Sequence, residues 1–302
     1  MSVIIGPKIH QLFATTNMSA RGRRSLEEVV FYEAVTTGDV ENVERMIQDT
    51  PELAMYISGK ESTLHLAAEH GQDAIISLLL KWKAILAEKN VDSGIFGESH
   101  LDMQDFFDES PLEVAARKGH ASTVELLLGI QTEKETISTR SQVGALKNAA
   151  MWGQNEVVKV FVRLGFDIDV LDEQETCALL YAIRNLNLST AALLIESGSK
   201  LFNVVCRDFL LLHYAARKNS VEIARFLIEN GADVNITNKN DLTPRDEAYL
   251  SQSKEVYNFL KENGGRMRSN KEYTDEEIIP YMRPKIVYRA VGFPPLMHLG
   301  YK

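Results

Sequence analysis

The sequence predicts an all-α fold, a solenoid in which pairs of short helices stack in single file. The first observation behind this prediction is the stretch 62–80, which holds two short helical patterns on either side of Gly71. The second is that the same pattern returns about every 33 residues along the chain. The third is an ordinary composition, 45% hydrophobic and 25% charged, without the run of about 18 apolar residues that a membrane span needs.

The expected solenoid begins with a helix pair at 29–47, after an N-terminal tail that we place at 1–27. The first 26 residues contain four basic residues and no acidic one, a pattern also seen in organelle targeting segments. We favour a flexible tail over a targeting segment, and we place the solenoid at 28–264 with about seven repeats. The other helix pairs are expected at 62–80, 110–128, 144–162, 177–195, 210–228 and 243–261.

One residue joins the two helices of each pair, and these joining residues define the period. Glycine there suits a left-handed helix end, which asparagine tolerates and which strains leucine. Alanine pairs such as Ala67–Ala68 and Ala115–Ala116 recur in the first helix, where small side chains let neighbouring helices approach closely. The joining residues are Gly38, Gly71, Gly119, Gly153, Leu186, Asn219 and Gln252, and the steps between them are 33, 48, 34, 33, 33 and 33 residues.

The 48-residue step indicates an insertion of about 15 residues within 84–108. This segment holds six acidic residues and one lysine, and Phe106 and Phe107 are among its apolar residues. Long loops in compact folds are often functional, so one interpretation is an acidic, aromatic loop that binds a partner. The other interpretation is an extended outer helix followed by a loop whose phenylalanines pack onto the solenoid.

The stretch 265–302 departs from the repeat pattern and forms a C-terminal extension. After Glu277 it contains four basic residues and no acidic one, interleaved with aromatic residues. Such a tail can bind nucleic acid, but terminal repeats of a solenoid also need a cap. We favour packing of the extension over the last repeat.

Several residues of the repeated phrase match one known motif. The chain resembles the ankyrin-repeat family over about 28–264, and the resemblance implies helix-turn-helix units with β-hairpin tips and a role in binding other proteins. In this family the motif histidine, here His65 and His213, makes a structural hydrogen bond. The matching segments are Leu64–Ala68, which reads Leu-His-Leu-Ala-Ala, Ser110–Leu112, which reads Ser-Pro-Leu, Gly231–Asn235, which reads Gly-Ala-Asp-Val-Asn, and Thr243-Pro244.

The sequence contains no phosphate-binding loop, no zinc-ligand spacing and no hydrolase nucleophile motif. Cys177 and Cys206 lie 29 residues apart at different positions of the repeat, which favours packing roles over a shared metal. We therefore expect no catalytic residue, no cofactor and no metal, and we predict that the protein is not an enzyme. The net charge of −9 disfavours contact with nucleic acid or with an anionic membrane.

The two residues that directly follow each alanine pair should point outward, towards the concave face of the solenoid. These positions hold five cations, here called the basic ladder, around Trp152. The ladder is a local positive patch on a chain whose net charge is −9. One interpretation is a groove for an acidic peptide or helix, since tryptophan and arginine are common in binding hot spots. The other is that ankyrin repeats often carry such residues there whatever they bind. The basic ladder is Arg117, Lys118, Arg184, Arg217 and Lys218.

The hairpin tips form a second candidate surface, and Phe106 and Phe107 of the insertion are candidate partner-binding residues. The run 227–235 resembles the sites in ankyrin repeats that a cytosolic asparaginyl hydroxylase modifies, which makes Asn235 a candidate hydroxylation site. The residues expected at the tips are Arg140, Ser141, Glu173, Gln174, Arg207, Lys239 and Asn240.

Together these features predict a non-enzymatic adaptor or inhibitor that binds a partner protein on the concave face and the tips. Two cysteines are too few for a disulfide framework, so we expect the cytosol or the nucleus, and we favour a monomer. A second hypothesis keeps the fold but makes the chain an effector that a bacterium or parasite exports to sequester a host protein. A nucleic-acid-associated regulator is disfavoured by the net charge.

Overall fold

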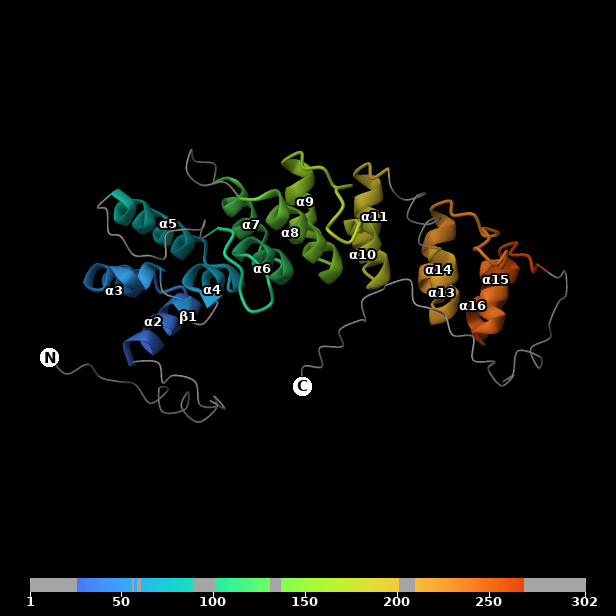
Figure 1. The fold of residues 1–302 in the computed structure, drawn as a ribbon, viewed down its shortest axis with the longest axis horizontal. Coiled ribbons are helices and arrows are strands. Elements are labelled where there is room, and N and C mark those ends of the chain that lie inside the picture. Colours follow the sequence, from blue (N-terminus) through green and yellow to red (C-terminus); the bar gives the residue numbers. More distant parts are fainter. Residues whose placement is uncertain are drawn as a thin grey trace. The chain divides into compact units, whose positions relative to one another are not determined.

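The computed structural model describes residues 26–55, 57–58, 61–88, 101–130, 137–200 and 210–268. The chain divides into two compact units, Met1–Lys200 and Leu201–Lys302. Within each unit the helices stand as stacked pairs, as Figure 1 shows. Residues 1–25 of the predicted tail 1–27 and residues 269–302 of the C-terminal extension lie outside the described residues, whereas Leu26 and Glu27 already belong to α2 (Leu26–Thr37).

In the first unit, helices alternate between an inner row and an outer row. Each helix packs against its partner within the pair and against the next helix of its own row. Because every pair covers the apolar face of its neighbour, no single central core is needed. The inner row is α2 (Leu26–Thr37), α4 (Thr63–Glu69), α6 (Pro111–Lys118), α8 (Thr139–Trp152) and α10 (Ala178–Arg184); the outer row is α3 (Val40–Asp49), α5 (Asp73–Glu88), α7 (Ala121–Leu128), α9 (Asn155–Arg163) and α11 (Leu188–Glu196).

The second unit repeats this arrangement with two helix pairs among its described residues. They are α13 (Leu211–Lys218) with α14 (Val221–Glu229), and α15 (Pro244–Leu250) with α16 (Lys254–Glu262). Helix α13 packs on α15, and α14 packs on α16. All seven predicted helix pairs are thus found, and the predicted all-α fold of helix-turn-helix units is confirmed.

Small side chains occupy the contacts between inner helices, as the sequence predicts. The alanine pairs of α4, α6, α8 and α13 are all 0% exposed. Outer helices turn larger apolar residues inward, among them the fully buried Ile75 and Ile76 of α5. Full burial of one such aliphatic side chain contributes about 1.5–3 kcal/mol, so the stack gains its stability at each interface between neighbours.

All seven joining residues have the left-handed conformation. The glycines have φ between +65° and +84°, and Leu186, Asn219 and Gln252 have φ of 62°, 53° and 58°. At Gly119 glycine is needed for a second reason, because a Cβ would lie 2.4 Å from Oε1 of Gln154 in the next repeat. The Gln154 side chain is held there by a 2.9 Å hydrogen bond that its Nε2 donates to the Arg117 carbonyl.

The motif histidines have the structural role that the family resemblance implies. His65 lies within 3.0 Å of the Glu109 carbonyl through Nε2 and within 2.8 Å of the Ser62 hydroxyl through Nδ1. His213 contacts the Leu242 carbonyl at 2.8 Å through Nε2. Burial lowers the pKa of both rings, although the carbonyl contacts oppose this, so both histidines are neutral links between repeats.

Strands are few among the described residues. β1 (Ile57–Ser58) and β2 (Glu61–Ser62) form an antiparallel hairpin before α4, and a single bridge joins Leu171 to Cys177 before α10. A 3-10 helix, η1 (Pro51–Met55), precedes the hairpin. Where the links between an outer helix and the next inner helix are described, they are mostly turns.

The first residues after α16 pack against α15. Met267 is 7% exposed, and the Thr243 hydroxyl donates a 2.7 Å hydrogen bond to the Arg266 carbonyl. The backbone N–H of Arg268 donates to the Asp246 carboxylate at 3.1 Å. These contacts tie residues 266–268 to the last repeat, and residues 269–302 lie outside the described residues.

Candidate protein-binding surface

Three repeats share one turn at the point where the chain enters the inner helix, which we call the tip turn. In the turn 105–109, Oδ1 of Asp105 accepts hydrogen bonds from the backbone N–H groups of Phe107 and Glu109 at 2.7 and 3.0 Å. The turns 172–176 and 238–242 repeat this pattern, with Asp172 and Asn238 as the acceptors. In each turn the fourth residue has φ between 55° and 64°.

Phe106 and Phe107 lie at the apex of the first of these tip turns. Their exposed fractions are 66% and 67%, so the alternative in which these phenylalanines pack onto the solenoid is wrong for this pair. The extended outer helix of that alternative is present, because α5 continues to Glu88. The insertion does not reach 108, since 105–109 is a regular tip turn of the repeat.

The fourth repeat has a helix where its neighbours have a tip turn. Thr139 occupies the position that Asp105 and Asp172 hold in adjacent repeats, and α8 begins at this threonine. The expectation that Arg140 and Ser141 lie at a tip is therefore wrong, because they belong to the first turn of α8. The threonine hydroxyl at position 139 closes such a turn more weakly than a carboxylate or amide oxygen does, so the helix is preferred there.

The early start of α8 is supported by the end of the insertion. The Asp102 carboxylate accepts hydrogen bonds from the Ser138 backbone N–H at 2.9 Å, the Ser138 hydroxyl at 2.9 Å and the Ser141 hydroxyl at 2.7 Å. Leu101, beside it, is 1% exposed. A carboxylate at the N-terminal end of a helix accepts hydrogen bonds from free N–H groups and interacts favourably with the helix dipole.

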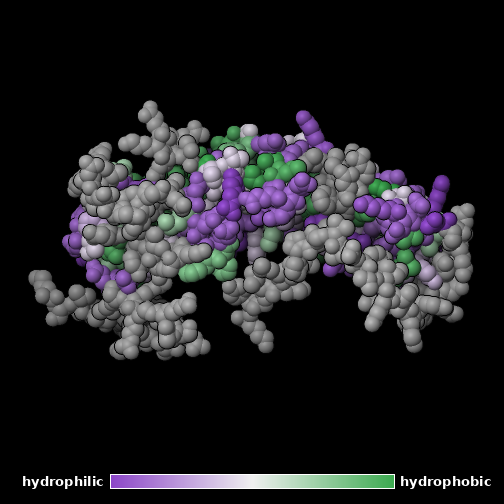
Figure 2. Space-filling model, in the orientation of Figure 1, coloured by the Kyte–Doolittle hydropathy of each residue, from purple (hydrophilic) through white to green (hydrophobic). Residues whose placement is uncertain are grey.

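The missing tip turn leaves an open groove of about 400 Å³ between the tip turns on either side, which we call the tip groove. Its floor is one face of α8, with Thr139, Val143 and Lys147 at a spacing of four residues. Its walls are residues 107–109 and 170–174. In the face shown in Figure 2, hydrophilic side chains gather over α6, α8 and α10, with hydrophobic ones at the margin.

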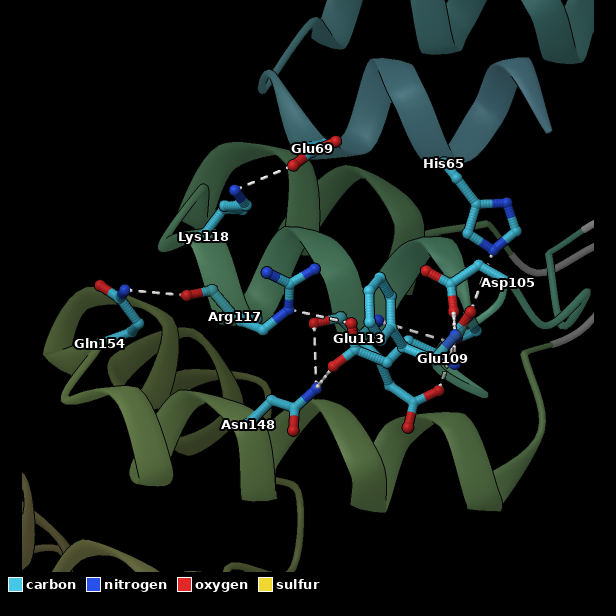
Figure 3. Close-up of polar contacts among 11 residues, drawn as sticks. His65, Glu69, Asp105, Glu109, Glu113, Arg117, Lys118, Asn148 and Gln154 are labelled. Carbon is cyan, nitrogen blue, oxygen red and sulfur yellow. Dashed lines mark hydrogen bonds and ion pairs between the residues drawn. The ribbon is translucent and has the colours of Figure 1, made fainter. Parts of the chain in front are cut away.

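Charged side chains cross the tip groove and line its floor. Arg140 pairs with Asp108 at 2.9 Å on one wall and with Glu173 at 3.3 Å on the other. Nδ2 of Asn148 donates a 2.7 Å hydrogen bond to Glu109, close to the buried Glu113, as Figure 3 shows. Burial raises the pKa of Glu113.

The basic ladder is present at the ends of the inner helices, but two of its cations in the first unit, Arg117 and Lys118, have acidic partners. Arg117 pairs with Glu109 at 2.9 Å, and Lys118 pairs with Glu69 of the preceding repeat at 2.9 Å (Figure 3). Partial burial acts to raise the pKa of Glu69, but the hydrogen bond and the charge of Lys118 outweigh it and lower this pKa. These two cations therefore do not form an uncompensated positive surface.

The rest of the ladder is divided between the two units. Trp152, the last residue of α8, is 49% exposed, and Arg184 is the last residue of α10. Arg217 and Lys218 end α13 in the second unit. There Arg217 lies 3.6 Å from the buried Glu247, and Lys218 lies 6.0 Å from the centre of the Tyr214 ring.

The candidate hydroxylation site, Asn235, is held by hydrogen bonds in the second unit. Its Oδ1 accepts a 2.7 Å hydrogen bond from the Arg266 backbone N–H, and its Nδ2 donates to the Gly264 carbonyl at 3.2 Å. Asp169 has the same place in its repeat, where its carboxylate accepts a 2.8 Å hydrogen bond from the Lys200 backbone N–H. A modifying enzyme would therefore meet an amide that links the last repeat to the residues after α16.

Within the described residues there is no group of three or more His, Cys, Asp or Glu side chains that could hold a metal ion. Over the same residues, no helix has the length and apolar character to span a bilayer. Cys177 is buried at the start of α10, and burial raises its pKa, as for a packing residue; Cys206 lies outside the described part.

Sequence reasoning missed the tip-turn acceptors and the groove that they frame. A signal was present, because Asp105, Asp172 and Asn238 recur at intervals of two repeats, while Thr139 and Val205 hold the same position in the repeats between them. Asp102 was missed as well, although Asp102, Asp169 and Asn235 each stand three residues before a tip-turn acceptor. The ion pairs of Arg140 depend on two tip turns at once and have no such signal.

The family can be read from comparison with known proteins. A family model described as "Ankyrin repeats (3 copies)" matches residues 31–139, 146–238 and 201–271. The chain belongs to the ankyrin-repeat family. Ankyrin-repeat domains typically bind other proteins and are typically non-catalytic, which agrees with the coarse functional prediction.

Two solved ankyrin-repeat structures resemble the chain. The ankyrin-repeat domain of Bcl-3, a member of the IkappaB protein family, is 24% identical with a TM-score of 0.55, and the match covers 76% of this chain and 97% of that one. The ankyrin-repeat domain of human ASB11 is 21% identical with a TM-score of 0.53, covering 76% and 96%. At these identities the likeness shows the fold alone.

A curated relative is similar over a shorter region. It is the transient receptor potential cation channel subfamily A member 1 homolog of Caenorhabditis elegans, 28% identical over 172 residues. The match covers 57% of this chain and 13% of that protein. Since the chain spans so small a part of this relative, the likeness concerns the shared segment and not the channel activity.

Proposed function

We propose that this chain is a non-enzymatic adaptor or inhibitor that binds a partner protein through the exposed side of its inner helices and through its tips. Its membership of the ankyrin-repeat family supports this role. The observation that carries the proposal is Trp152, a large aromatic side chain at the end of α8 that is 49% exposed. Tryptophan is strongly enriched in binding hot spots, where it is covered by the partner.

The partner need not be acidic. Arg117, Lys118 and Arg217 have carboxylate partners, and each such pair would have to be broken or shared on binding. The charge argument for an acidic peptide is therefore weaker than the sequence indicates, whereas the aromatic argument is stronger. As the place of action we propose the cytosol or the nucleus, because two cysteines provide no disulfide framework.

Quantitative affinity purification of the full chain from cell extract tests this function. Trp152→Ala should weaken capture of the main partner about 30-fold, the effect of losing a hot-spot residue of about 2 kcal/mol. Leu164→Ala is the matched control, because Leu164 is 44% exposed but lies at the end of the outer helix α9. Equal capture by wild type and Trp152→Ala would contradict binding at this surface.

A second pair of variants tests the charge of the partner. Arg184→Glu combined with Arg217→Glu reverses one ladder cation in each unit. Loss of capture by this double variant would restore the acidic partner that the ladder indicates. Retained capture, together with loss in Trp152→Ala, would support an aromatic contact without charge selection.

A further inference from the structure

The tip groove exists because one repeat departs from its neighbours. In adjacent repeats the tip turns 105–109 and 172–176 project beyond the inner helices, while α8 fills the equivalent positions between them. The groove is therefore bounded by two walls and a helical floor within a single unit. Such a space of about 400 Å³ has room for several side chains of an extended peptide.

The walls of the tip groove carry exposed apolar side chains. Phe107 is 67% exposed on one wall, and Leu171 is 51% exposed on the other. Val143 lies between them on the floor. Large exposed apolar residues gathered at a concave site mark contact surfaces more often than scattered ones do.

The lining of the groove is acidic. Five carboxylates line it against the two cations Arg140 and Lys147; of the five, Glu109 also pairs with Arg117 and Glu113 is buried. Both cations are engaged, since Arg140 bridges the two walls and Lys147 lies 5.8 Å from the centre of the Tyr181 ring. The five carboxylates are Asp108, Glu109, Glu113, Asp172 and Glu173.

We infer that the tip groove binds an extended segment of a partner protein in which a lysine or arginine stands next to an apolar residue. The inference rests on the proposed function and adds the chemistry of the segment that is recognised. The apolar side chain contacts Phe107 and Leu171, and the cation lies between Asp108 and Glu173.

The chain supplies its own example of the recognised group. The guanidinium of Arg140 already lies between Asp108 and Glu173, at 2.9 and 3.3 Å, and the Arg140 side chain is 52% exposed. An incoming arginine makes the same contacts only if Arg140 leaves them. Removal of Arg140 should therefore strengthen binding, whereas removal of the carboxylates should weaken it.

The test uses the full chain and three fluorescein-labelled decapeptides, in which leucine alternates with arginine, serine with arginine, and leucine with glutamate. Fluorescence polarisation at physiological salt should give tight binding for the arginine–leucine peptide only. The arginine–serine peptide should bind about tenfold more weakly, because it lacks the apolar contact. Equal affinity for the two arginine peptides would reduce the effect to general attraction by an acidic protein and overturn the inference.

Variants locate the peptide on the chain. Asp108→Asn combined with Glu173→Gln, and separately Phe107→Ala, should each weaken binding about tenfold. Arg140→Ala should strengthen it about fivefold, a gain that loss of folding cannot imitate. Glu125→Gln is the charge control, because Glu125 pairs with Arg163 at 2.6 Å on the outer helices, away from the groove.

The opposite results would overturn the inference. They are an effect of Glu125→Gln as large as that of the double variant, or unchanged affinity in Arg140→Ala. The groove and the Trp152 surface are tested separately, since residues 140 and 152 on α8 lie about 18 Å apart at 1.5 Å per residue. If no peptide binds but Trp152→Ala still loses the partner, this inference fails and the proposed function stands.

Discussion

Removal of the Asp102 carboxylate is expected to loosen the start of α8 and with it the floor of the tip groove. This carboxylate accepts hydrogen bonds from the backbone N–H and hydroxyl of Ser138 and from the hydroxyl of Ser141. The two hydroxyl groups can turn to water, so the lasting loss is the backbone N–H. Hydrogen bonds to a charged group contribute about 1.5–3 kcal/mol, and the charge at a helix N-terminus about 0.5 kcal/mol more.

We therefore expect Asp102→Ala to lower the free energy of unfolding by about 3 kcal/mol. Asp102→Asn keeps an acceptor oxygen and loses the charge, so its expected effect is about 1 kcal/mol. Asp108→Ala is the matched control, because it removes an exposed ion pair with Arg140, and such pairs contribute about 0–1 kcal/mol.

Urea unfolding followed by tryptophan fluorescence measures these differences. The chain has two tryptophans, Trp82 and Trp152, and in a Trp82→Phe background the remaining one reports on α8. Because stacked repeats can unfold in steps, hydrogen exchange of the α8 amides should accompany the fluorescence. If Asp102→Ala and Asp108→Ala destabilise equally, the carboxylate does not hold α8 and the account of the missing tip turn is refuted.

Three further predictions concern other features of the repeats: a joining glycine, the motif histidines and the candidate hydroxylation site. Gly119→Ala should destabilise by about 1–2 kcal/mol, seen in urea unfolding, because φ is +84° and the new Cβ would displace Gln154; no loss would contradict the strain. Burial depresses the pKa of His65 and His213 below 6.5, so their contribution to stability is complete above pH 6.5 and falls as the pH drops below it. Melting temperatures measured across this pH range should therefore depend less on pH in His65→Gln than in wild type. An unchanged pH dependence would refute the assignment. Intact-mass measurement after exposure to an asparaginyl hydroxylase should show one added oxygen that Asn235→Ala lacks, and an unmodified wild-type chain would reject that site.

The period of the repeat predicts far more than the helices. From one recurring position the sequence locates seven left-handed residues, including Leu186, Asn219 and Gln252, which are not glycines. It also locates the buried alanine pairs and the structural histidines. These features are predictable because each depends on a single residue and on its immediate neighbour in the stack.

The candidate site depends instead on contacts between side chains of different repeats. The ladder looks basic in sequence, but Lys118 meets Glu69 of the preceding repeat once the repeats are stacked, and Arg117 meets Glu109 in the tip turn of its own repeat. Likewise Phe106 and Phe107 look like part of an insertion until the hydrogen bonds of the tip turn show their regular place.

By itself, then, the sequence determined the all-α stack, its register and the residues that must be small or left-handed, because the backbone and the dry faces repeat with a fixed period. Only the tertiary structure decided which charges are compensated, which aromatic residues stay exposed and where a tip turn is missing. The ion pairs of Lys118 and Arg140 join side chains of different repeats, where no local pattern records the contact.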